Sequence, residues 1–115
     1  YHSNQVWAKL CLELSPQGQV MVVSVVTRGT SDDCNSIPVA GNSAYLRVAK
    51  QERAFAFHYS LDGVRWDFVR YFTLGDVSNV EMGFLAQSPM GNGCTARFQK
   101  ITYVPGKLND LRSGE

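Results

Sequence analysis

Side chains that could bind a polar ligand gather directly after the apolar run Val20 to Val26 in this sequence of 115 residues. Carboxylates accept hydrogen bonds from sugar hydroxyls, while arginine donates several hydrogen bonds in a fixed fork. Arg28, with Ser31 and two aspartates that begin at Asp32, could therefore form an ion-paired pocket for a hydroxyl-rich ligand. The alternative is that Ser31 or Asp32 caps a turn and that Arg28 pairs with a neighbouring carboxylate on the surface.

A second candidate group lies near the N-terminal end of the chain, where Trp7 and Lys9 are two residues apart. On an extended strand such residues share one face, so both side chains could contribute to one ligand surface. A tryptophan ring can stack on the apolar face of a pyranose or pack into a core, and both alternatives stay open for Trp7. For Trp66, which follows the turn dipeptide Asp62-Gly63, packing over the turn is the favoured interpretation.

Catalysis and metal binding are not expected from these residues. Glycosidases hold two carboxylates about 5–10 Å apart across a sugar, whereas Asp32 and Asp33 are adjacent and point to opposite faces of an extended chain. His58 has no neighbouring nucleophile motif, so a hydrogen-bonded histidine within a sheet is its expected role. Two carboxylates beside an arginine supply too few oxygens for calcium. We predict no catalytic residue, no metal and no cofactor; a divergent glycoside hydrolase accessory domain remains an alternative.

Length and composition place the chain in a broad class. At 115 residues, with 44% hydrophobic side chains, it has the size of one domain and enough apolar residues for a core. Its 11 basic and 10 acidic residues leave a net charge of +1, which gives no nucleic-acid or membrane-surface signature. The longest apolar run is far shorter than the ~20 residues that a membrane-spanning helix needs. Three widely spaced cysteines, an odd number, favour reduced thiols and a cytoplasmic location.

Apolar residues alternate with polar ones along several short segments, a pattern that predicts strands and no helix. Seven strands are expected, over Gln5–Leu14, Gln19–Thr27, Tyr45–Lys50, Ala54–Ser60, Val64–Phe72, Val80–Gln87 and Cys94–Val104. Turn residues separate them, as in Ser15–Gly18, while the polar stretch after Arg28 and the following Ile37–Ser43 are interpreted as a loop and a connection. The pattern predicts an all-β antiparallel sandwich or jelly roll over residues 1–104, with a C-terminal tail, 105–115, that frays.

Four stretches of the chain occur in an order that resembles the DUF1349 family of concanavalin A-like jelly-roll proteins. They are Trp7-Ala8-Lys9, Val25 to Asp32, Phe57 to Trp66, and Met82 to Pro89. The resemblance implies the fold of the concanavalin A-like lectin/glucanase superfamily and a carbohydrate-binding-like role. Because members are often labelled regulation of enolase protein 1, it also implies an alternative, a cytoplasmic protein-interaction or regulatory domain.

Two departures from the family pattern bear on these expectations. Members usually carry further strands ahead of the stretch that matches Trp7, so the resemblance implies the C-terminal part of a larger jelly roll. Uncovered core residues and open strand edges would then favour a homo-oligomer. Asp33 and Cys34 stand where members typically carry a tryptophan, which removes an expected aromatic platform for a sugar at that loop.

These observations together predict a non-catalytic, carbohydrate-binding-like domain whose partner is a saccharide or another protein. Neither a nucleic acid nor a membrane is expected as a partner. The residues expected to line the binding site are Trp7, Lys9, Arg28, Ser31 and Asp32.

Overall fold

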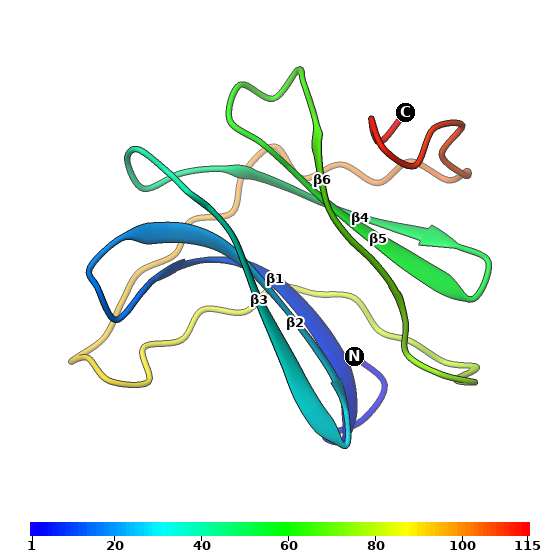
Figure 1. Ribbon diagram of the computed structural model, residues 1–115, viewed down its shortest axis with the longest axis horizontal. Coiled ribbons are helices and arrows are strands. Elements are labelled where there is room, and N and C mark those ends of the chain that lie inside the picture. Colours follow the sequence, from blue (N-terminus) through cyan, green and yellow to red (C-terminus); the bar gives the residue numbers. More distant parts are fainter.

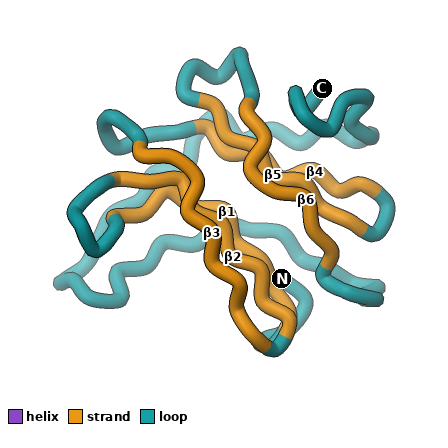
Figure 2. Tube along the Cα trace, viewed as in Figure 1, coloured by secondary structure: helices purple, strands orange, loops and turns teal.

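Residues 6–38 form the first of two antiparallel sheets, with β2 between β1 and β3 (Figures 1 and 2). The computed structural model describes residues 1–115, and in it β1 (Val6–Leu14) pairs with β2 (Val20–Arg28) in continuous register. The predicted Ser15–Gly18 turn joins these two strands, and Gly18 adopts a φ of 79° there. A tighter turn at Gly29 leads into β3 (Thr30–Pro38).

The second sheet has the same three-strand layout, with β5 (Ala54–Ser60) between β4 (Tyr45–Gln51) and β6 (Asp67–Thr73). β4 pairs with β5 without a register shift, whereas one irregularity interrupts the pairing of β5 with β6. Every residue of β5 is buried. Burial on both faces is typical of a strand that lies centrally in a covered sheet.

The connection from β5 to β6 contains the turn predicted at Asp62-Gly63. The Asp62 carboxylate accepts hydrogen bonds from the backbone N–H groups of Val64 and Arg65. These donors lower the pKa of the Asp62 carboxyl below its usual value. Gly63 has a φ of 78°, and a Cβ at this position would lie only 2.9 Å from the Cζ atom of Tyr45. The turn therefore requires glycine at this position.

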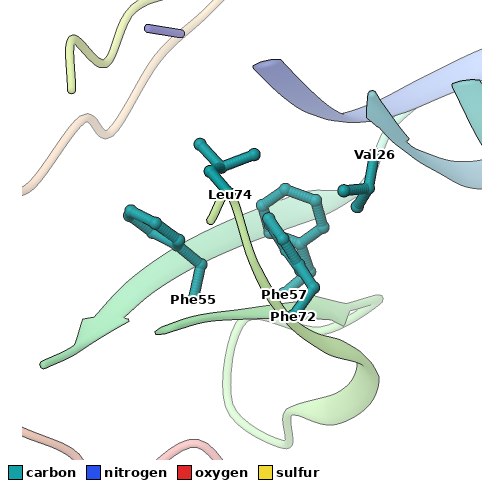
Figure 3. Close-up of a cluster of buried hydrophobic side chains, with 5 residues drawn as sticks. All are labelled: Val26, Phe55, Phe57, Phe72 and Leu74. Atoms are coloured by element: carbon teal, nitrogen blue, oxygen red, sulfur yellow. The ribbon is translucent and has the colours of Figure 1, made fainter. Parts of the chain in front are cut away.

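A layer of apolar side chains lies between the two sheets and holds them together. Its main cluster consists of Val26, Phe55, Phe57, Phe72 and Leu74 (Figure 3). Val26 comes from the first sheet, while the three phenylalanines come from the second. Phe57 and Phe72 contact edge to face, with their ring centroids 4.7 Å apart. A smaller cluster extends the layer and consists of Val22, Val39 and Tyr59.

Each sheet has an inner face, turned to the other sheet, and an outer face. Val26 lies on the inner face of the first sheet, together with the residues at even positions of β1 and β2. The odd-numbered residues from Trp7 to Glu13 therefore lie on its outer face, because side chains alternate along a strand. In the second sheet Phe55 and Phe57 are inner, so His58 lies on the outer face.

Three predictions about strands are corrected by the structure. Thr30–Pro38, expected as a loop and a connection, is a strand because the buried β2 needs a hydrogen-bonded neighbour on each side. Its polar side chains are tolerated at the sheet edge, where most of them are exposed. Val80–Gln87 and Cys94–Val104 are not strands, so the fold has six strands rather than about seven. The structure contains no helix, and hence none long and apolar enough to cross a membrane.

The segment after β6 lacks the strands predicted for it because it has no partner. No backbone–backbone hydrogen bond joins residues 82–109 to any part of the chain. An apolar, alternating pattern becomes a strand only where a neighbouring strand pairs with it. Eight large hydrophobic side chains of this segment are exposed: Met82, Phe84, Leu85, Met90, Phe98, Ile101, Tyr103 and Val104.

The C-terminal residues do not fray as the sequence predicted. Residues 107–115, here called the C-terminal segment, fold back over the outer face of the second sheet, beside β4 and β5 (Figure 1). Gly114 is buried in this position. The prediction was wrong because polar side chains of the sheet hold the segment through its backbone carbonyls, which no apolar pattern reveals.

Candidate functional site

The outer face of the first sheet brings Trp7 and Ser31 into one row. Trp7 lies opposite Thr27 of β2, which in turn lies opposite Ser31 of β3. Residues directly opposite on neighbouring strands project to the same face. The Thr27 and Ser31 hydroxyls are hydrogen-bonded, with 2.8 Å between Oγ1 and Oγ. The row therefore consists of the Trp7 ring on β1, the Thr27 hydroxyl on β2 and the Ser31 hydroxyl on β3.

A second row runs beside the first. Lys9 lies opposite Val25 of β2, which lies opposite Asp33 of β3. The Lys9 ammonium pairs with Glu13 Oε2 at 3.4 Å, while Asp33 is exposed. Both rows lie over buried residues of β2, namely Val25 and Thr27. Together they present an aromatic plane, a cation, the exposed Ser31 hydroxyl and carboxylates, which can stack on and hydrogen-bond a hydroxyl-rich ligand.

Arg28 and Asp32 lie on the other side of the first sheet and contact the second sheet. Asp32 Oδ2 pairs with Arg70 Nη2 at 2.6 Å, and Arg70 Nη1 also donates to the Asp32 carbonyl oxygen at 3.1 Å. Arg28 Nη1 donates to the carbonyl oxygen of Thr73 at 3.0 Å. The ion pair expected among Arg28, Asp32 and Asp33 is thus replaced by one between Asp32 and Arg70. Both contacts fix the β2–β3 end of the first sheet to β6.

Cys11 shares the outer face of β1 with Trp7 and Lys9, but its thiol is not activated. Burial raises the pKa of the Cys11 thiol to about 12, and the neighbouring Glu13 carboxylate adds to the increase. A thiol that stays protonated is a poor nucleophile and a poor metal ligand. No group of three or more His, Cys, Asp or Glu side chains is arranged to hold a metal ion.

Sequence reasoning missed a second set of polar side chains, on the outer face of the second sheet. Arg47 lies directly opposite His58, and Gln51 lies farther along the same face of β4. The Arg47 guanidinium stacks 3.7 Å from the centroid of the Trp66 ring, and burial lowers the pKa of Arg47. His58 was expected to be a hydrogen-bonded sheet histidine, and its Nε2, 2.7 Å from the Leu111 carbonyl oxygen, confirms this. Alternation along β4 was the signal that could have found this face.

Comparison with known proteins identifies a family over most of the chain. The family model described as "Protein of unknown function (DUF1349)" matches residues 1–105. The match covers both sheets and the extended segment after β6, and it ends before the C-terminal segment. A search of curated proteins gave no significant match, and a search of solved structures gave none either.

Replacing Asp32 with Asn is expected to remove the ion pair with Arg70 and to lower the free energy of unfolding by about 0.5–1 kcal/mol. The expected loss is modest because 59% of the Asp32 side chain is exposed, although Arg70 is only 17% exposed. Asp33→Asn is the matched control, since Asp33 forms no salt bridge. Urea denaturation measures both variants, and added salt should shrink the Asp32 effect. Equal losses in the two variants would contradict the role of Asp32 between the sheets.

Proposed function

Because the chain belongs to the DUF1349 family, whose function is unknown, we propose that it is a non-catalytic binding domain with a concanavalin A-like jelly-roll architecture. Two antiparallel sheets that share one apolar layer support this architecture. The ligand is a saccharide, which binds on the outer face of the first sheet. Since fold alone does not imply function, the proposal depends on the side chains of that face.

The observation that carries the proposal is the row formed by Trp7, Thr27 and Ser31. The Trp7 ring offers an apolar plane on which a pyranose can stack. The exposed Ser31 hydroxyl, which the buried Thr27 hydroxyl holds in place, can donate and accept hydrogen bonds with sugar hydroxyls. Lys9 and Asp33, in the neighbouring row, add a charged donor and a charged acceptor within reach of the same ligand.

Arg28 and Asp32 have a supporting role in this proposal. Arg28 follows Thr27 in β2, and Asp32 follows Ser31 in β3. By binding β6, their side chains fix the turn between β2 and β3 and so keep the two hydroxyls of the row in register. Binding sites need this kind of support, because small displacements of the contacting groups weaken a ligand's hydrogen bonds.

Calorimetric titration with saccharides selected on a glycan array tests this proposal. Trp7→Ala is expected to weaken binding about ten-fold or more, since the loss of ~1.4 kcal/mol of stacking corresponds to ten-fold in Kd. Tyr71→Ala is the matched control, because Tyr71 is an aromatic residue on the outer face of the second sheet and is 49% exposed. This variant should bind as the wild type does. The proposal fails if no saccharide binds, or if Trp7→Ala retains full affinity while remaining folded.

A second candidate function, protein interaction, is favoured by the exposed apolar segment after β6. Its eight exposed hydrophobic side chains exceed what isolated surface residues explain. Residues 82–96 contain no charged side chain, so two copies of the segment can approach without like-charge repulsion. Their backbone groups are free to form a ladder between chains. We propose that a second copy of the chain covers this segment.

Self-association should appear in size-exclusion chromatography with light scattering, as an average mass above that of one chain that falls on dilution. Phe84→Lys places like charges at the contact and is expected to shift the protein toward the monomer. Leu61→Lys is the matched control, since Leu61 is 58% exposed but lies in the β5–β6 connection. A wild-type protein that is monomeric at every concentration would contradict the proposal, as would equal effects of the two substitutions.

A further inference from the structure

The C-terminal segment occupies the outer face of the second sheet through its backbone carbonyl groups (Figure 1). Three side chains of the sheet each donate a hydrogen bond to one carbonyl oxygen. The donor and acceptor pairs are Gln51 with Leu108, His58 with Leu111, and Arg47 with Gly114. The nitrogen–oxygen distances of the first two pairs are 3.5 Å and 2.7 Å. The accepting carbonyls are thus spaced three residues apart, although the segment forms neither a helix nor a strand.

These three donors form one array on the sheet. Arg47 and Gln51 are four residues apart on β4, so they share a face, and His58 of β5 lies directly opposite Arg47. The Trp66 ring holds the Arg47 guanidinium from one side, and the His58 ring contacts Phe68 edge to face at 5.7 Å. Aromatic contacts of this kind limit the rotamers of the donors. Aromatic residues of the domain therefore help to position Arg47 and His58, in addition to the segment that covers them.

The segment fits closely at one end of this array. Gly114 is buried with a φ of 73°, and a Cβ there would lie 3.0 Å from Arg47 Nη1 and 3.1 Å from His58 Cδ2. The Arg112 guanidinium lies 4.5 Å from the centroid of the Phe68 ring. Only glycine allows the backbone to approach the donors so closely in this conformation.

The segment does not satisfy the whole face. The His58 side chain is fully buried, and its Nδ1 atom has no hydrogen-bond partner. Buried polar atoms without a partner are rare in folded proteins, because each costs free energy. A pocket also remains between the segment and the sheet, lined by Gln51, Glu52, Tyr71, Leu108, Asn109 and Leu111. The face thus offers more polar groups and more space than residues 107–115 use.

The three donor side chains and the segment that they bind belong to different parts of the chain. Arg47, Gln51 and His58 lie within residues 1–105, which match the family, whereas the C-terminal segment follows the match. We propose that this face is a peptide-binding site of the domain and that residues 107–115 are its intramolecular occupant. The ligand is a peptide that forms a turn like that of residues 110–115, so that its backbone carbonyls accept from the three donors, with a glycine next to Arg47 and a polar group for His58 Nδ1. Such a peptide binds when it displaces the C-terminal segment.

The segment competes as a tethered ligand, with an effective concentration in the millimolar range for a short connection. Weakening its docking should therefore strengthen binding of a free peptide with the same sequence. Gly114→Val prevents the close approach to Arg47 and His58. Asp110→Ala weakens the segment in a second way, because the exposed Asp110 carboxylate accepts the Arg112 N–H through Oδ1 within the turn. Gly41→Val is the matched control, since Gly41 also has a positive φ, 104°, and no atom lies within 4 Å of a Cβ there, but it lies in the β3–β4 connection.

Fluorescence anisotropy with a labelled peptide of residues 107–115 tests the proposal on the full chain. The Gly114→Val and Asp110→Ala chains should bind the peptide about ten-fold or more tightly than the wild type, and Gly41→Val should bind like the wild type. Adding Arg47→Ala or Gln51→Ala to Gly114→Val should abolish the gain.

Equal affinities in the wild type, Gly114→Val and Asp110→Ala would overturn the proposal, and so would a gain that survives Arg47→Ala. A saccharide that binds Gly114→Val where the peptide does not would also overturn it, in favour of a sugar site on this face. Circular dichroism of each variant shows that the sheets remain folded. The saccharide test on Trp7 concerns the other sheet, so the two proposals can fail independently.

Discussion

The structure depends on the contact between two small sheets through one apolar layer. A three-stranded sheet on its own is marginal in water unless it buries a hydrophobic face. Here Val26 from the first sheet meets Phe57 and Phe72 from the second, and each sheet covers the apolar face of the other. This contact occupies both inner faces. The groups that remain available to ligands therefore lie on the two outer faces, and the two proposed sites are found there.

Because the inner faces are occupied, polar residues that are adjacent in the sequence have different roles on the two faces of the first sheet. Thr27 and Arg28 are adjacent, as are Ser31 and Asp32, so strand alternation sends one of each pair outward and the other toward the second sheet. Arg28 and Asp32 consequently hold β6, while Thr27 and Ser31 form part of the outer row. A polar cluster that looks like one pocket in the sequence serves two purposes on two faces.

Local patterns in the sequence were sufficient to predict a strand where apolar and polar residues alternate along it. Alternation predicted β1 and β5. The resemblance to the DUF1349 family came from four motif stretches, and the match over residues 1–105 confirms it. β3 could not be predicted, because Thr30–Asn35 has no apolar alternation and is a strand only as the neighbour of β2. Val80–Gln87 fails for the opposite reason, since its pattern suits a strand but nothing pairs with it. Trp7 and Lys9 could be placed on one face from their spacing. The partner of Asp32, Arg70, is 38 residues away and left no local sign.

Hydrogen exchange of the backbone amides in increasing urea tests the shared layer most directly. If the two sheets stabilise each other, the amides of β2 and β5 form one cooperative unit and lose protection over the same range of urea. Residues 82–109, which form no backbone–backbone hydrogen bonds, should exchange rapidly even without urea in the monomer. Protection of β5 that persists after β2 has become fully exchangeable, or the reverse, would show that the sheets fold separately and would contradict this account.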